Sequence, residues 1–459
     1  MKKIKFPNAF VVLLIIIVIT TILTYIIPAG SYQRSIVDGR TVVSGNSFEF
    51  IKQTPVSLFN MFKAIPQGII SATELITMIL SIGGFIAIIN ETSAIEALIF
   101  TIRNKVGDKN SSVIISGLVL FFGFLGAFVG MLEASIPFAT ICISIALALG
   151  YDIIVGMSIP FIGIVLGFTA GPTNPWTVGV GQEIGELPLY SGILYRIIIL
   201  AIFMSIGALY ICSYGNKVKA NKNNSLVKNI NNPNYYSKKK EVNLTFKRKL
   251  VILSFLLTLA MVILGTLKLN FTTIDMTTAY IIGSVVAGFI FGFNGDKIST
   301  TFLNGAKSLF VAAMAIGVSR GISIIMKSGN IQDTVIYYFS NLLNTFPSWA
   351  FAVVMYIFQG FINFFIPSGS GQAMVTLPTM LPTADIIALN RQIGILAYQL
   401  GDGITNLFYP TVGCLIGFLE VTKVPYTTWM KFITPLVGIL FFTGIIILLV
   451  ATLINYGPY

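Results

Sequence analysis

An unbroken apolar run at positions 9–27, AFVVLLIIIVITTILTYII, limits what the chain can fold into. About 18 apolar residues in helical form are enough to cross the hydrocarbon core of a bilayer. A cleaved signal peptide has a shorter apolar core and a small-residue cleavage site, and no such site precedes Pro28. Further apolar stretches follow, and only 10% of the residues are charged. The sequence therefore predicts an all-α polytopic membrane protein.

The chain divides into two hydrophobic halves, 1–214 and 250–459, joined by the polar stretch 215–249. Helices of the first half are expected near 8–28, 72–90, 112–129, 153–169 and 189–213. Those of the second half are expected near 250–267, 277–294, 309–327, 348–366, 390–408 and 430–454. Residues 30–60 carry several charges and are expected to form a loop outside the membrane.

The stretch 215–249 is strongly basic, with ten Lys or Arg residues against one acid, Glu241. Basic residues also stand at positions 2, 3 and 5, directly before the first apolar run. Because Lys and Arg gather on the cytoplasmic side of membrane proteins, the N-terminus and the 215–249 linker are expected in the cytoplasm. This placement explains the net charge of +12 without a nucleic-acid partner, and brings basic residues near anionic lipid headgroups.

The two halves resemble each other in sequence. With residue 153 aligned to 391, an offset of 238, five of 29 positions are identical, and none of the five is a common membrane aliphatic. The alignment indicates an internal duplication. If each copy has an odd number of crossings before its matching segment, the copies face opposite sides of the membrane. The sequence thus supports an inverted repeat as a hypothesis.

Two apolar stretches are interrupted by residues that end helices. IPSGSGQAM at 366–374 lies between the apolar runs FINFF and AMVTLPTML. GAFVGMLEAS at 126–135 lies at the aligned place in the first half and carries an acid. Breaks of this kind are retained in membranes where they line a cavity, and the alternative is a plain turn in water. We expect re-entrant hairpins near 123–150 and 364–386.

The helix ends at these breaks are expected to bind the carboxylate of a solute. Free N–H groups and the positive end of a helix dipole attract anions, and glycine lets a ligand approach the backbone closely. The substrate contacts predicted at the two hairpins are Glu133, Ala134, Ser368, Gly369, Ser370, Gly371 and Gln372.

A second pair of breaks is expected where Gly, Pro, Thr and Asn interrupt two further helices, near 170–175 and 402–411. Backbone and side-chain oxygens at such unwound segments commonly hold Na⁺ in transporters. The predicted ligands of a coupling ion are Gly171, Thr173, Asn174, Asp402, Thr405 and Asn406, and the further substrate contacts predicted here are Thr173, Asn174, Asp402, Asn406 and Thr411. Hydrogen bonding between helices is the alternative for Thr and Asn. A membrane-buried acid such as Asp402 is costly and usually functional.

Arg320, in AIGVSRGIS, is a further charge expected within a span. We predict that it pairs with Glu133 or Asp402 or contacts a substrate carboxylate, with snorkelling to the membrane surface as the alternative. The chain has no histidine, which excludes His-ligated metals and catalysis by Ser–His or Cys–His pairs. It has no Walker lysine for ATP either. No enzyme activity and no cofactor are expected, apart from Na⁺ or H⁺ as a coupling ion.

Six short motifs together resemble the YfcC-like carriers, in matching order over nearly the whole chain. They are PAGSY at 28–32, LGYD at 149–152, SGSGQA at 368–373, NRQ at 390–392, QLGDG at 399–403 and YPT at 409–411. These carriers group with anaerobic four-carbon-dicarboxylate carriers and arginine/ornithine antiporters. The resemblance implies a secondary carrier of the ion-transporter superfamily in the bacterial inner membrane. It also implies a scaffold domain, a transport domain with two re-entrant hairpins, and elevator-type movement.

The resemblance places the hairpin tips at Gly130–Glu133 and Ser368–Gln372 and the unwound segments at Gly171–Asn174 and Thr405–Thr411. The sequence departs from the pattern at Leu132–Ala134, where some relatives carry two adjacent acids. One acid fewer counts against a doubly charged or strongly cationic solute.

The expected function is secondary active transport of a small carboxylate-bearing solute by ion coupling or exchange. Charge favours an amino acid, and a basic one such as arginine or ornithine first. Glu133 and Asp402 suit a cationic side chain or a coupling ion, whereas the helix ends and Arg320 suit the α-carboxylate. A C4-dicarboxylate carrier is the alternative, and a channel or an intramembrane enzyme is less favoured. The sequence leaves open Na⁺ or H⁺ coupling, antiport or symport, and a homodimer.

Overall fold

The computed structural model describes residues 9–37, 40–43, 47–95, 97–98, 101, 111–130, 132–228, 243–269, 271–343 and 345–457. The basic residues 2, 3 and 5 and four charged residues of the linker, at positions 238–241, lie outside these ranges. Within them, eight helices are long and apolar enough to cross a membrane, and shorter apolar helices accompany them. The prediction of a multi-pass helical protein is confirmed.

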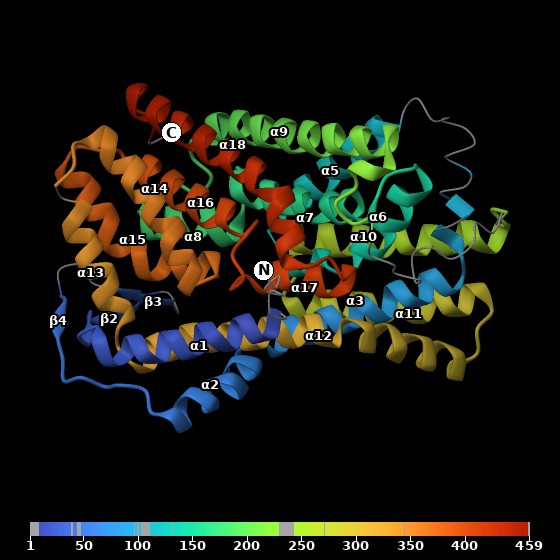
Figure 1. The fold of residues 1–459 in the computed structure, drawn as a ribbon, viewed down its shortest axis with the longest axis horizontal. Helices are drawn as coiled ribbons and strands as arrows, with labels where there is room; N and C mark the ends of the chain where they lie inside the picture. Colours follow the sequence, from blue (N-terminus) through green and yellow to red (C-terminus); the bar gives the residue numbers. More distant parts are fainter. Residues whose placement is uncertain are drawn as a thin grey trace.

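The chain is an elongated helical bundle (Figure 1). Its first half contains α1 (Ala9–Ile26), α2 (Leu58–Ser71), α3 (Thr73–Glu91), α5 (Ser111–Phe128), α6 (Phe138–Ala148), α7 (Ile153–Ala170), α8 (Val180–Ile184) and α9 (Ile193–Ala220). Its second half contains α10 (Phe246–Leu269), α11 (Thr273–Phe291), α12 (Gly295–Ser328), α13 (Gln332–Leu343), α14 (Ser348–Phe365), α15 (Gly369–Ile386), α16 (Arg391–Thr405), α17 (Gly413–Thr422) and α18 (Tyr426–Leu453).

The same order of elements occurs in both halves. A helix pair (α5–α6 or α14–α15) is followed by a broken helix (α7–α8 or α16–α17) and then by a long helix (α9 or α18). α7 and α16 begin at 153 and 391, the two positions that the sequence alignment superposes. Each start is capped by the preceding side chain: Asp152 accepts from the Val155 N–H at 3.1 Å, and Asn390 accepts from the Gln392 N–H at 2.9 Å. In Figure 1, α7 and α16 lie in the middle of the bundle, α9 and α18 along one side and α1 and α12 along the other.

The loop predicted at 30–60 contains short strands, so the protein is not purely helical. β1 (Gly30–Ser31) pairs antiparallel with β4 (Glu49–Phe50), and β2 (Arg34–Val37) pairs with β3 (Arg40–Val43). The strands lie beside α13 (Figure 1), where Arg34 forms an ion pair of 2.7 Å with Asp333. Strands of two to four residues are too short to show a clear alternating pattern in the sequence. Asp333, which is far from them in the sequence, helps to anchor them.

Several predicted boundaries were wrong. α2 begins at Leu58, inside the predicted loop, and α12 is 34 residues long rather than the expected 309–327. α16 continues through Asp402 to Thr405, so Asp402 lies in regular helix and not in an unwound segment. The segments expected near 112–129 and 348–366 correspond to α5 and α14, and α5 has the length and hydropathy of a membrane span. α9 and α10 extend into the predicted linker and carry five of its ten basic residues.

Close packing of α5 on α7 depends on glycines. A Cβ on Gly126 would overlap the Ile164 carbonyl oxygen and lie 2.8 Å from the Phe168 nitrogen, both backbone atoms that cannot turn away. A Cβ on Gly117, on the same helix, would meet nothing within 4 Å. The two positions therefore form a matched pair for testing the α5–α7 contact.

We expect Gly126→Ala to lower the stability of the purified protein by about 1–3 kcal/mol, because the backbones of α5 and α7 must separate. Gly117→Ala should raise stability by roughly 0.5–1 kcal/mol through better helix propensity. Thermal unfolding in detergent micelles measures both. An unchanged melting temperature for Gly126→Ala would contradict this account of the contact.

Candidate functional site

The turns of the two helix pairs pack on one segment, Asn174–Thr177, directly after α7. Gly130, in the α5–α6 turn, has φ of 72°, and a Cβ there would lie 2.6 Å from Asn174 Oδ1. A Cβ on Gly369, at the start of α15, would lie 3.0 Å from Thr177. Glycine is needed at the first turn both for its backbone angle and for its close approach. Two breaks more than 200 positions apart in the sequence therefore meet.

A cavity of about 90 Å³ lies between these turns and α12. This volume is well above the ~10–15 Å³ that a single water needs. Its lining is Glu133, Ile316, Ser319, Arg320, Ser323, Lys327, Gln332, Ile366, Pro367, Ser368, Gly371, Val375 and Gly413. Glu133 and the serine–glycine tract, predicted to act together, line the same cavity.

The cavity contains charges of both signs. Glu133 stands on the short 3-10 turn Glu133–Ser135, while Arg320 and Lys327 are two turns apart on α12. In the described part of the chain, Glu133 and Arg320 form no ion pair with each other or with Asp402. Sequence reasoning missed Lys327 as a residue of this cavity. The feature of the sequence that could have identified Lys327 is its position seven residues after Arg320, because residues seven apart lie on the same face of a helix.

Two helix starts also border the cavity. Ser368 precedes α15 and Gly413 begins α17, and neither helix has a side-chain cap. Uncapped first turns present free N–H groups and the positive end of the helix dipole. The Tyr398 hydroxyl donates to the Gly369 carbonyl at 2.5 Å and holds the start of α15 in place. This wall of the cavity is suited to a carboxylate.

The remaining residues predicted at the hairpins lie elsewhere. Gln372 is fully buried and donates to the Gln359 carbonyl at 2.8 Å, so it braces α15 against α14. Ala134 lines a separate apolar cavity of about 40 Å³ that also borders α10 and α11. Gly369 packs on Thr177, and Ser370 is half-buried outside the cavity lining.

Asp402 lies away from this cavity, in a polar cluster between α14 and α16. It is 1% exposed, and neither carboxylate oxygen has a hydrogen-bond partner in the structure. Asn363, which sequence reasoning missed, donates through Nδ2 to the Asp402 carbonyl at 2.9 Å, to Thr405 Oγ1 at 2.9 Å and to Asn406 Oδ1 at 2.8 Å. These bonds leave Asn363 Oδ1 buried without a partner, and Thr411 Oγ1 is in the same state. The feature of the sequence that could have identified Asn363 is that its amide is the one polar side chain in the apolar run FINFF.

At the first break, after α7, the oxygens of Gly171 and Asn174 accept hydrogen bonds, while Thr177 Oγ1 is buried without a partner. The Gly171 carbonyl accepts from Gln399 Nε2 at 2.9 Å, and Asn174 Oδ1 accepts from the Trp176 N–H at 3.0 Å. Thr173 is half-buried between them. The residues predicted to bind a coupling ion therefore fall into two groups. The oxygens of Gly171 and Asn174 at the first break accept hydrogen bonds from the protein, whereas the carboxylate oxygens of Asp402 near the second break have no partner.

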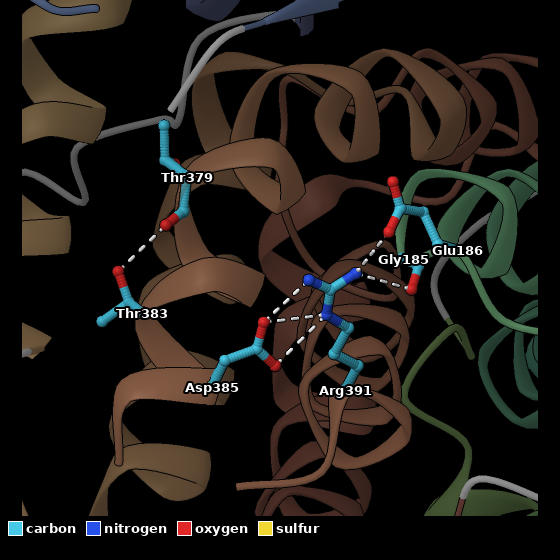
Figure 2. Close-up of polar contacts among 6 residues, drawn as sticks. All are labelled: Gly185, Glu186, Thr379, Thr383, Asp385 and Arg391. Atoms are coloured by element: carbon cyan, nitrogen blue, oxygen red, sulfur yellow. Dashed lines mark hydrogen bonds and ion pairs between the residues drawn. The ribbon is translucent and has the colours of Figure 1, made fainter. Parts of the chain in front are cut away.

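A polar clasp joins the halves at the other end of α15 and α16 (Figure 2). Arg391 contacts Asp385 Oδ2 at 2.7 Å, the Gly185 carbonyl at 3.0 Å and Glu186 Oε2 at 3.3 Å. Figure 2 also shows the Thr383 hydroxyl bonded to Thr379 along α15. The clasp ties the end of α8 to the α15–α16 connection.

We expect Arg391→Gln to reduce stability by about 1–2 kcal/mol, because it removes a bidentate ion pair and a bond to a helix-end carbonyl. Lys423→Gln breaks an exposed pair with Glu420 and should cost at most about 0.5 kcal/mol. Thermal unfolding of the two variants compares them. Equal melting temperatures would show that the clasp does not join the halves.

The family described as C4-dicarboxylate anaerobic carrier, DcuC, matches residues 6–453. YfcC of Escherichia coli (strain K12), whose name describes a proposed basic amino acid antiporter, is 28% identical, over 98% of this chain and 97% of its own. A protein of Haemophilus influenzae is 26% identical over the same shares.

Two solved structures are similar over 98% of the chain. Neisseria gonorrhoeae MtrF, presented as one of a class of antimetabolite efflux pumps, has a TM-score of 0.47 at 16% identity and is covered over 96% of its length. The Alcanivorax borkumensis YdaH transporter has a TM-score of 0.45 at 12% identity and is covered completely. Likeness at this level does not establish a shared fold.

The whole-chain family match and the relative YfcC confirm the resemblance found in the sequence. They also make this protein a transporter rather than an enzyme. The chain belongs to the DcuC family of C4-dicarboxylate anaerobic carriers.

Proposed function

We propose that this carrier moves an amino acid across the bacterial inner membrane, by exchange or by coupling to a cation. The observation that carries the proposal is that Glu133 and Arg320 line one cavity without pairing with each other. Opposite charges left apart in one cavity suit the two charged ends of a zwitterion. Arg320 and the start of α15 would take the carboxylate, and Glu133 would take the ammonium group.

A basic amino acid is the class to test first. The reason is that the relative YfcC carries the name of a basic amino acid antiporter, since Glu133, the acid in the cavity lining, is assigned to the α-ammonium group that every amino acid has. The C4-dicarboxylate alternative has its own support in Lys327, which adds a second cation, and in the description of the family. The two substrate classes differ in whether they need Glu133, since a dicarboxylate has no group to pair with it.

The coupling cation, Na⁺ or H⁺, would bind at the second break. Asp402 offers two buried carboxylate oxygens without partners, and Asn363 and Thr411 each offer one oxygen. Hard oxygen ligands of this kind suit Na⁺, and a buried carboxylate can instead take up a proton.

We also propose an inverted repeat in which the two helix pairs enter the membrane from opposite sides. α2 and α3 together cover 58–91 and α12 covers 295–328, both 34 residues, which makes α11 the counterpart of α1. α10 is then an extra crossing that inverts the second copy. With the N-terminus in the cytoplasm, α5–α6 would enter from inside and α14–α15 from outside, as elevator-type carriers require.

Labelling tests this orientation. Single cysteines are placed in the connections 149–152 and 387–390 of a variant that lacks the three native cysteines. An impermeant thiol reagent added to intact cells should label the second connection, and the first only after the cells are opened. Labelling of both connections from outside would rule out the inversion.

Counterflow in reconstituted vesicles tests the substrate class. Vesicles loaded with unlabelled arginine, ornithine, lysine or succinate receive the same labelled compound outside. The proposal predicts saturable accumulation of a basic amino acid. Saturable accumulation of succinate alone would favour the dicarboxylate alternative, and an ohmic current would indicate a channel.

A further inference from the structure

Arg196, near the start of α9, is a buried arginine that the transport site as described does not use. It is 1% exposed, and its Nε has no hydrogen-bond partner. Its other nitrogens donate to neutral amide oxygens, Gln399 Oε1 and, at 3.5 Å, Gln392 Oε1. The phenol of Tyr456 is a third uncharged neighbour. A guanidinium held inside a membrane protein among neutral groups is costly, which marks it as functional.

Gln399 connects Arg196 to the end of α7 through hydrogen bonds. Its Oε1 accepts from Arg196, while its Nε2 donates to the Gly171 carbonyl at 2.9 Å and to the Phe168 carbonyl at 3.4 Å. α7 ends at Ala170, so these are carbonyls of its last turn and cap. Carbonyls at a helix C-terminus lack helical partners and carry the negative end of the dipole. Arg196 therefore places a positive charge, through one amide, against the first break.

The two breaks differ in what their oxygens contact. At the first, the Gly171 and Phe168 carbonyls and Asn174 Oδ1 all accept hydrogen bonds from the protein, and only the neutral Thr177 hydroxyl among the described side chains there is buried without a partner. At the second, both carboxylate oxygens of Asp402 and Asn363 Oδ1 are buried without partners. Half-helix C-terminal ends are where transporters of this architecture hold their cations. The first break is therefore connected to the positive charge of Arg196, whereas the second has oxygens of Asp402 and Asn363 without partners.

We propose that Arg196 is a fixed internal cation that occupies the place of a coupling ion at the first break, so that the carrier binds one coupling cation per substrate. The inference rests on the proposed function, because it takes the cluster around Asp402 as the site of the mobile cation. Arg196 is a positioning residue, since it acts on the α7 carbonyls through Gln399 and touches neither substrate nor coupling ion.

Stoichiometry of the wild-type protein gives the first test. Reversal potentials of uptake are measured in vesicles with fixed gradients of substrate and of Na⁺ or H⁺. One cation per substrate supports the inference, and two cations per substrate overturn it. Saturable counterflow without any cation-coupled uptake would also overturn the inference while leaving exchange standing, and wild-type vesicles without counterflow would overturn the proposed function itself, so the two failures can be told apart.

Chemical rescue gives the second test. Arg196→Ala leaves a space the size of a guanidinium and should lower counterflow about tenfold or more, since a charge-assisted contact is lost. Guanidinium chloride at millimolar concentration should restore most of the rate, whereas urea, of the same shape and without charge, should not. Arg196→Lys should keep more of the rate than Arg196→Ala.

Arg248→Ala is the matched control, because Arg248 lies on α10 and donates to the Thr92 carbonyl, away from both breaks. Its counterflow should stay near that of the wild type and should not respond to guanidinium. Equal rescue of Arg196→Ala by urea and guanidinium would assign Arg196 a packing role and overturn the inference. Wild-type counterflow in Arg196→Ala would overturn it as well. If Arg196→Ala does not fold, the stoichiometry decides.

Discussion

Replacing Asp402 with asparagine is expected to abolish counterflow and uphill uptake while leaving the protein as stable as the wild type or more stable. The wild-type carboxylate is 1% exposed and has no hydrogen-bond partner, so its charge is uncompensated unless a cation binds. Asparagine has the same shape without the charge and removes this burial cost. Transport should fall about 100-fold or more, because the cation loses a ligand worth ~3–5 kcal/mol. Counterflow and thermal unfolding on the same preparation measure both effects.

Asp333 provides the matched control for Asp402. It is similarly buried, but its carboxylate is paired with Arg34 and accepts from the Tyr32 N–H at 3.0 Å. Asp333→Asn should therefore lower stability and keep the transport rate per folded molecule. Wild-type counterflow in Asp402→Asn would show that the coupling site lies elsewhere.

The second large effect is expected at the substrate cavity. Glu133→Gln should reduce counterflow of basic amino acids about 100-fold, because losing one partner of a desolvated charge pair costs ~2–5 kcal/mol. Arg320→Gln should have a loss of the same order through the carboxylate end. Initial rates over a range of substrate concentrations in vesicles measure both.

Glu91 is the control acid for this cavity, because its exposed pair with Lys297 lies on the surface. Glu91→Gln should leave counterflow within about twofold, as exposed pairs contribute little. Undiminished arginine counterflow in Glu133→Gln would place the ammonium group of the substrate elsewhere. Loss of arginine counterflow with unchanged succinate counterflow in the same variant would show two overlapping substrate sites.

The sequence alone predicted the parts of the site that carry local signals. Pro367, Gly369 and Gly371 all disfavour a helix interior, so a break near them was predictable, and α14 does end at Phe365 while α15 begins at Gly369. The aligned break near Glu133 followed from the internal repeat. The prediction that both breaks act at one site rested on the general rule that paired breaks in transporters face the same solute.

Other parts depend on contacts between distant segments. Lys327, Asn363 and Arg196 are single polar residues in or near apolar runs, and each sequence context fits a surface, a hydrogen bond or a site equally well. Their contacts become visible only when α12, α14 and α9 are packed against the breaks. Asp402 was misplaced because flanking glycines suggested unwinding, whereas Gly401 and Gly403 allow close packing of α16 on Tyr356 and Thr169.

The zwitterion claim is tested most directly by competition in the counterflow assay. Unlabelled arginine is compared with agmatine, which lacks the carboxylate, and with 5-guanidinovalerate, which lacks the α-ammonium group. Arginine should compete at least about tenfold more strongly than either analogue, because each analogue leaves one cavity charge unpaired. Equal competition by 5-guanidinovalerate, or competition by succinate without any by arginine, would contradict the assignment of Glu133 and Arg320 to the two ends of an amino acid.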